Sequence, residues 1–153
     1  MDGPHVMQSD VFRVELPGDW QAQPLPGAPM GDAAFVQPGT GFSFFQTVMG
    51  PGPDGRADSV DTVRAALNTR LDALAGNGHA VEPGRIAFTK RDYGPVGICD
   101  LTLDGQRYAV MVGYGFADCV LIHFMDGDPS QSESVRNAVQ GVLDGVSHTG
   151  GAA

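Results

Sequence analysis

Three apolar runs follow one another late in the sequence, and only three residues separate each pair. The runs cover residues 96–103, 107–115 and 119–125. Connections of this length join antiparallel strands, because a parallel pair needs a crossover of a dozen or more residues. The segment therefore predicts a three-stranded antiparallel meander, with turns at Asp104-Gly105-Gln106 and Phe116-Ala117-Asp118.

Two other segments carry apolar residues at helical spacing. The first covers 59–75; Asp58 or Ser59 supplies its N-cap, and Gly76 stands where a C-terminal glycine belongs. The second covers 130–146. Their apolar stripes are Val60, Val63, Leu67, Leu71 and Leu74 in the first, and Val135, Ala138, Val139, Val142, Leu143 and Val146 in the second.

The remaining strands are expected in the first half of the chain and just before the meander. They cover 11–16, 33–37, 42–49 and, interrupted by Pro83-Gly84, 80–91. The order is then three strands, helix, four strands, helix. Strands that follow one another through short turns form a largely antiparallel sheet, on whose apolar face helices pack. The sequence therefore predicts an α+β fold with an antiparallel sheet and two main helices.

The chain length suits one domain, since 153 residues are enough to bury a core. We expect a single α+β domain over residues 11–147. Residues 1–10 and 148–153 are expected to be tails.

The sequence is acidic, with a net charge of −9. Nucleic-acid binding needs clustered basic side chains, so this class of partner is not expected. The dispersed acidic residues predict a solvated surface, or alternatively a surface complementary to a basic partner. Eight of the nine basic residues are Arg, which indicates a GC-rich bacterial source.

Neither a membrane span nor a secretory signal is indicated. No apolar run approaches the ~20 residues that cross a bilayer, so stable membrane insertion is not expected. The start, from Met1 to His5, lacks the basic and apolar regions of a signal peptide. A cytoplasmic location is therefore expected.

No motif indicates an enzyme or a metal site. Cys99 and Cys119 lack the spacing of metal ligands, and the predicted turns place them too far apart for a disulfide. Asp126-x-Asp128-x-Ser130 lacks the glycine and distal glutamate of a calcium loop, so a capping turn before the helix explains it better. We expect no catalysis, no cofactor, no bound metal and two buried thiols.

The meander is apolar on both faces, and strands of this kind are covered on both sides. One face is dense and β-branched and is expected in the core: Val96, Ile98, Val110, Val112, Val120, Ile122 and Phe124. The softer face carries Cys99, Leu101, Leu103, Met111, Gly113, Leu121, His123 and Met125. Either a second helix layer or a partner covers this softer face, because methionine-rich surfaces repack around differing apolar segments.

Five residues of the softer face form the candidate partner-binding site: Leu101, Met111, Leu121, His123 and Met125. If a partner covers them, they are partly exposed in the free protein or buried in a homodimer seam.

The strand pattern also resembles a known superfamily. An opening Phe-x-Val-x-Leu-Pro-x-x-Trp at residues 12–20 is followed by Ala34-Phe35-Val36 and a long helix, and Ile122-His123-Phe124 ends a late hairpin before the last helix. From 11 to 146 the chain resembles the PsbP/Mog/DcrB superfamily, which implies an α/β/α sandwich. In layout it is most similar to the Eag-type chaperones of bacterial type VI secretion.

This resemblance implies a non-enzymatic adaptor or chaperone that shields an apolar segment of a secreted bacterial effector. One alternative is an immunity or inhibitor protein that neutralises a toxin through its acidic surface. Another is an enzyme whose site carries no obvious motif.

Overall fold

The computed structural model describes residues 5–9, 11–23, 32–50 and 55–148. Within them it places two antiparallel sheets and two helices, α1 (Val60–Gly76) and α2 (Ser132–Asp144). A short 3-10 turn at Pro129–Gln131 precedes α2. The predicted α+β class and both predicted helices are confirmed.

The larger sheet has the strand order β3-β4-β5-β10-β9-β8-β6, and β7 pairs with β8 beside β6. Its strands are β3 (Gln21–Gln23), β4 (Ala33–Gln37), β5 (Phe42–Met49), β6 (Val81–Pro83), β7 (Ala87–Arg91), β8 (Gly94–Leu103), β9 (Arg107–Gly115) and β10 (Val120–Gly127). The smaller sheet has the order β1-β2-β11 and contains β1 (His5–Gln8), β2 (Phe12–Leu16) and β11 (Val146–His148).

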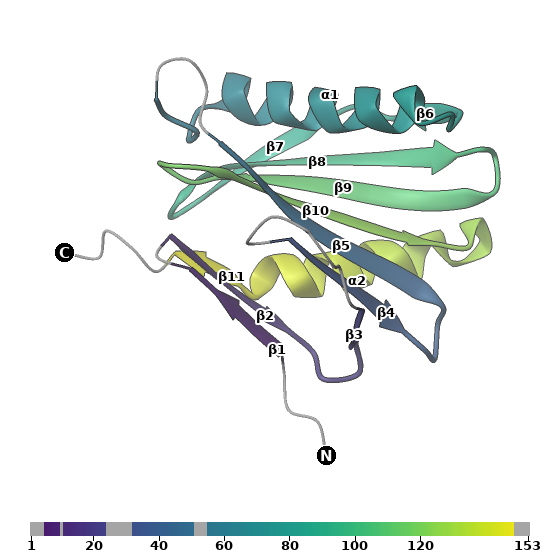
Figure 1. Cartoon of the computed structure of the whole chain (residues 1–153). Helices are drawn as coiled ribbons and strands as arrows, with labels where there is room; N and C mark the ends of the chain where they lie inside the picture. The colour runs from purple at the N-terminus through teal and green to yellow at the C-terminus, as the bar shows by residue number, and fades with distance from the viewer. Residues whose placement is uncertain (1–4, 10, 24–31, 51–54, 149–153) are drawn as a thin grey trace.

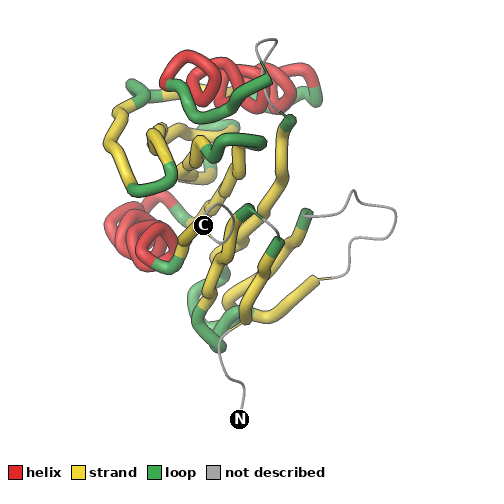
Figure 2. The backbone as a smooth tube through the Cα atoms, turned by 90° about the vertical axis from the view of Figure 1, so that its left-hand side faces the viewer, coloured by secondary structure: helices red, strands yellow, loops and turns green. Residues whose placement is uncertain are grey.

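The two helices lie on opposite faces of the larger sheet (Figures 1 and 2). Under α1, Val63 and Leu67 pack with Met111 in one buried cluster. On the opposite face, α2 and the smaller sheet contribute to a second cluster that holds most of the aromatic core. The arrangement agrees with an α/β/α sandwich, to which the smaller sheet adds a further element.

Glycines allow α1 to lie close to the sheet. A Cβ at Gly113 would stand 3.0 Å from Val63 Cγ1, and one at Gly97 would stand 3.0 Å from Leu67 Cδ1. The helix begins where Ser59 Oγ accepts a hydrogen bond from the N–H of Thr62. The local cap and the apolar stripe explain why the sequence pattern located this helix.

The register of β10 differs from the prediction by one residue. Val120, not Cys119, pairs with Gly115. The connection therefore has four residues, and the N–H of Phe116 donates to the carbonyl of Cys119 across it at 2.9 Å. A slip of one residue moves every side chain of a strand to the other face, so the predicted faces are wrong for β10.

Three short strands lie where tails or loops were expected. Residues 5–8, placed in the N-terminal tail, form β1 against β2, and β11 reaches His148 of the predicted C-terminal tail. The third is β3, which pairs with β4. Of the other residues of the expected tails, 1–4, 10 and 149–153 lie outside the described residues.

Candidate functional site

The five residues predicted to bind a partner are all buried within the monomer. None is more than 3 % exposed. The expectation that they are partly exposed is therefore wrong, because α1 covers these residues on one face of the sheet and α2 with the smaller sheet covers them on the other.

The structure also does not bring the five together. Leu101 and Met111 face α1, whereas Leu121 and Met125 belong to the cluster on the opposite face. The cause is the one-residue slip of β10, which places its odd-numbered residues beneath α2 instead of beside Met111.

His123, the fifth residue, lies in the core, and both of its ring nitrogens form hydrogen bonds. Its ring lies between the rings of Phe44 and Tyr114, with centroids 4.7 and 4.8 Å away. The Nε2–H donates to Gln46 Oε1 at 2.9 Å, so Nδ1 is the nitrogen that accepts the Tyr114 hydroxyl, also at 2.9 Å. Burial lowers the pKa of His123 to about 3, so the ring is neutral at pH 7.

This network stabilises the core and offers no chemistry to a substrate. A general base must reach the proton it removes, and neither the His123 ring nor the Tyr114 hydroxyl is open to solvent. Burial also raises the pKa of Tyr114 well above its usual value. Both groups are thus held in their neutral forms.

The two thiols are free and buried. Cys99 lies opposite Met111, whereas Cys119 lies in the turn that follows Gly115 on the same strand. Met111 and Gly115 are four residues apart along β9, which corresponds to about 13 Å. The two cysteines beside them are therefore too far apart for a disulfide. Burial raises the pKa of Cys99 and raises that of Cys119 to about 11.

We expect alkylation of the denatured chain without reductant to add two adducts. In the native protein the same reagent should react far more slowly, because at pH 8 only about one Cys119 in a thousand is thiolate at such a pKa. Intact-mass spectrometry measures both. A mass without adducts after denaturation would contradict the register of the meander.

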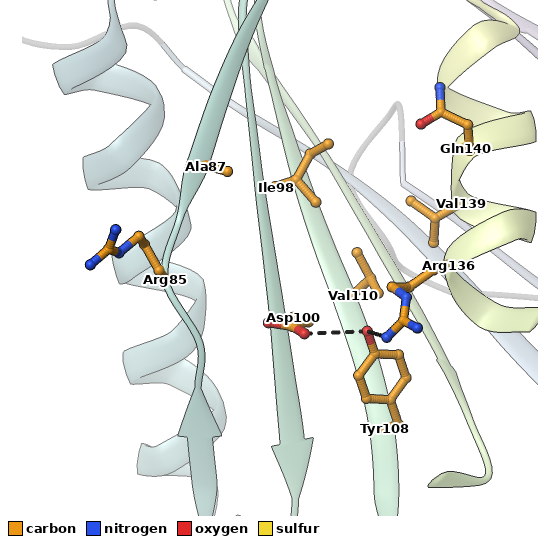
Figure 3. Close-up of a pocket in the computed structure, with 9 residues that line it drawn as sticks. All are labelled: Arg85, Ala87, Ile98, Asp100, Tyr108, Val110, Arg136, Val139 and Gln140. Atoms are coloured by element: carbon orange, nitrogen blue, oxygen red, sulfur yellow. Dashed lines mark hydrogen bonds between the residues drawn. The ribbon is translucent and has the colours of Figure 1, made fainter. Parts of the chain in front are cut away.

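An open groove lies on the face of the larger sheet that carries α2 (Figure 3). Because α2 packs mainly on β9 and β10, the adjoining part of β8 and β7 stays uncovered on this face. The hollow has a volume of about 310 Å³. Its apolar surface comes from Ala87, Ile98, Val110 and Val139.

Polar side chains form the rim of this groove, which we call the α2 groove. The Arg136 guanidinium donates to the Tyr108 hydroxyl at 3.3 Å, and that hydroxyl donates to Asp100 Oδ2 at 3.4 Å (Figure 3). Burial raises the pKa of Tyr108, and the hydrogen bond with Tyr108 raises that of Arg136. Arg85 and Gln140 complete the rim.

The α2 groove can hold apolar side chains and pair with a carboxylate at its edge. Its volume is near the lower end of the ~300–1,000 Å³ typical of small-molecule pockets. Its polar groups show no nucleophile beside a base, which nucleophilic catalysis would require.

Met111 borders a smaller hollow on the other face of the sheet. This hollow, of about 220 Å³, lies between α1 and β5 and is lined also by Phe45, Leu74 and Phe124. A hollow thus lies beside Met111 on the face of β9 that was predicted to be less densely packed, although Met111 itself is buried.

Sequence reasoning missed the residues of the α2 groove. Ile98 and Val110 were assigned to a fully covered core face, and Arg85 and Arg136 lie far apart in the sequence. One signal was available. Asp100 lies two residues after Ile98 and so on the same face of β8, and a charged residue there indicates that this face contacts water.

In the part of the chain that the structure describes, no group of three or more His, Cys, Asp or Glu side chains could hold a metal ion. No described helix is long and apolar enough to cross a bilayer.

Comparison with known proteins finds similarity in structure alone. No family model matches the sequence, and no curated protein matches it. The solution structure of cyanobacterial PsbP (CyanoP) from Synechocystis sp. PCC 6803 has a TM-score of 0.74 at 9 % identity and covers 97 % of this chain and 94 % of that one. A crystal structure from Bacteroides thetaiotaomicron VPI-5482 has a TM-score of 0.51 at 13 % identity; it covers 97 % of this chain and 49 % of that one. The chain therefore has a PsbP-like fold.

Proposed function

We propose that this protein is a non-enzymatic adaptor or chaperone that binds an apolar segment of another protein in the α2 groove. The observation that carries the proposal is the hollow beside α2, in whose floor Ala87 is exposed and Ile98 partly exposed, while Val110 and Val139 are buried. Hollows lined by apolar side chains with a few polar groups at the edge are the usual form of a binding site.

The composition of the groove fits a protein segment. Aliphatic side chains form its floor, and its rim provides the Tyr108 phenol and the Arg136 guanidinium to orient a bound chain, whereas Arg85 extends away from the groove (Figure 3). Contacts of this kind are typical of an interface core with a polar rim.

The finer form of the proposal concerns the partner and the compartment. We propose that the bound segment belongs to a secreted bacterial effector and that the protein holds it in the cytoplasm before export. The resemblance in layout to Eag-type chaperones supports this form, and two buried free thiols are compatible with a reducing compartment.

Changing Ala87 to Glu should strongly reduce capture of the partner. The new carboxylate would stand at the open side of the groove against an apolar segment, which should weaken binding by about tenfold or more. The measurement is a pull-down from the native host, quantified by mass spectrometry against wild type.

The matched control is Ala65→Glu. Ala65 is likewise an exposed alanine, on α1 and so on the other side of the sheet. Proteins lost with Ala87→Glu but kept with Ala65→Glu are the groove's partners. If both variants retain the wild-type set, the α2 groove is not the binding site and the proposal fails.

A further inference from the structure

The outer edge of β7 has no strand paired with it among the described residues. Strand β8 pairs with β9 on one side and with β7 and β6 on the other, and this pairing leaves β7 as the sheet margin. Ala87 of β7 also lines the α2 groove. The groove is therefore bounded by a sheet edge that can accept another strand.

The backbone of this edge is oriented for pairing. Lys90 lies opposite Pro95, which has no N–H to donate. In an antiparallel pair this fits a position where the two residues exchange no hydrogen bonds, so the N–H and C=O of Lys90 point away from β8. The same holds two residues earlier, at Phe88.

Hollows flank the edge on both faces of the sheet. The α2 groove lies on one face. On the other, Val60, Phe88, Lys90 and Pro95 contribute to a second hollow of about 520 Å³. Val60 there is 40 % exposed, which is unusual for a large apolar side chain of this protein. Because side chains of a strand alternate between faces, an added strand would fill both hollows.

Two basic side chains lie along this edge of an otherwise acidic protein. Arg85 precedes β7 and extends on the side away from β8 (Figure 3), and Lys90 lies within β7. In the described residues neither Arg85 nor Lys90 forms an ion pair, whereas Arg91 bonds Asp144 at 3.4 Å. Of the carboxylates near the edge, Asp58 pairs with Arg56 and Asp100 accepts from the Tyr108 hydroxyl, whereas Glu82 of β6 and Asp92, directly after β7, are exposed.

We propose that an extended, acidic segment of another protein adds to β7 as a further strand of the larger sheet. Alternate apolar side chains of this segment enter the two hollows, and its carboxylates pair with Arg85 and Lys90. This inference rests on the proposed function and specifies the chemistry of the partner. A second copy of this chain fits less well, because it would bring two sets of cations together at one edge.

The test uses two blocked nonapeptides with the same alternating valine–threonine centre. One carries two aspartates at each end, and the other carries lysines there. The aspartate peptide should bind about tenfold or more tightly than the lysine peptide, and this ratio should shrink at high salt. In NMR spectra the backbone amides of Phe88 and Lys90 should become protected from exchange.

Two variants of one residue separate charge from backbone pairing. Lys90→Ala removes the charge and keeps the N–H, so it should weaken the aspartate peptide by about fivefold or less. Lys90→Pro also removes the N–H and should abolish binding. Its melting temperature should stay near that of wild type, because this N–H is not used by β8.

Other outcomes would overturn the inference. One is that both peptides bind equally well. Another is that Lys90→Pro binds the aspartate peptide as strongly as Lys90→Ala does. The third is that the wild type forms a concentration-dependent dimer that Lys90→Pro dissociates. The partner pull-down distinguishes the two proposals. A partner lost with Ala87→Glu but kept with Lys90→Pro retains the groove and rejects strand addition, whereas a partner kept with both rejects the proposed function.

Discussion

Replacing Leu121 with Asp should lower the free energy of unfolding by about 4 kcal/mol. Leu121 has no exposed surface and lies in the cluster between the larger sheet and α2. A carboxylate there loses its hydration among apolar side chains and has no cation to pair with. For a chain of this size the melting temperature should fall by on the order of 10 °C. Thermal and urea unfolding followed by circular dichroism measure both quantities.

The matched control is Val60→Asp. Val60 is 40 % exposed and begins α1, where a carboxylate is favoured by the helix N-terminus. Its free energy of unfolding should therefore change by no more than about 0.5 kcal/mol. A near-normal melt for Leu121→Asp would mean that this face of β10 is open, and it would restore Leu121 as a partner-binding residue.

The helices were predictable because their signals are local. In α1 the apolar stripe and the Ser59 cap lie within one continuous segment, whereas Gly76, predicted to follow the helix, is its last residue and Asn77 is the C-cap. Each of these features acts through neighbours in the sequence, so no tertiary information is needed to read them. The same holds for α2, whose four buried residues all belong to the predicted stripe, although Val146, placed at the end of that stripe, lies in β11.

The register of β10 was not predictable in this way. Val120 and Ile122 are apolar, and so are Leu121 and Met125, since both faces of this central strand are covered. The pattern of a strand without polar alternation does not show which residues point to which face of the sheet. One residue more or less in the preceding turn exchanges the two faces. The candidate site depended on that register and was lost with it.

The α2 groove depends on long-range packing. It exists because α2 covers β9 and β10 but not β8. No local sequence pattern encodes how far a helix extends across a sheet. Its floor residue Ile98 reads as an ordinary core residue, and only Asp100 beside it signals an open face. Strands β1 and β11 were missed for the same reason, because each is short and forms through pairing with β2.

His123 should make the protein lose stability as the pH falls. Its pKa is about 3 in the folded state against 6.5 in the unfolded chain. Below pH 6.5 the unfolded state therefore binds a proton that the folded state does not, and the free energy of unfolding falls by about 1.4 kcal/mol per pH unit until the folded pKa is reached. Between pH 7 and pH 4.5 this amounts to roughly 2–3 kcal/mol. Urea unfolding at a series of pH values measures it.

His123→Gln isolates this contribution, because an amide keeps a donor and an acceptor for Gln46 and Tyr114 but does not titrate. Exposed carboxylates with lowered pKa, such as Asp128, are present in both proteins, and their effect cancels in the difference. At pH 7 the wild type should be the more stable, and its advantage should narrow by roughly 2–3 kcal/mol at pH 4.5. If the two stability curves run parallel across this range, His123 titrates normally in the folded state, and the buried network does not hold it neutral.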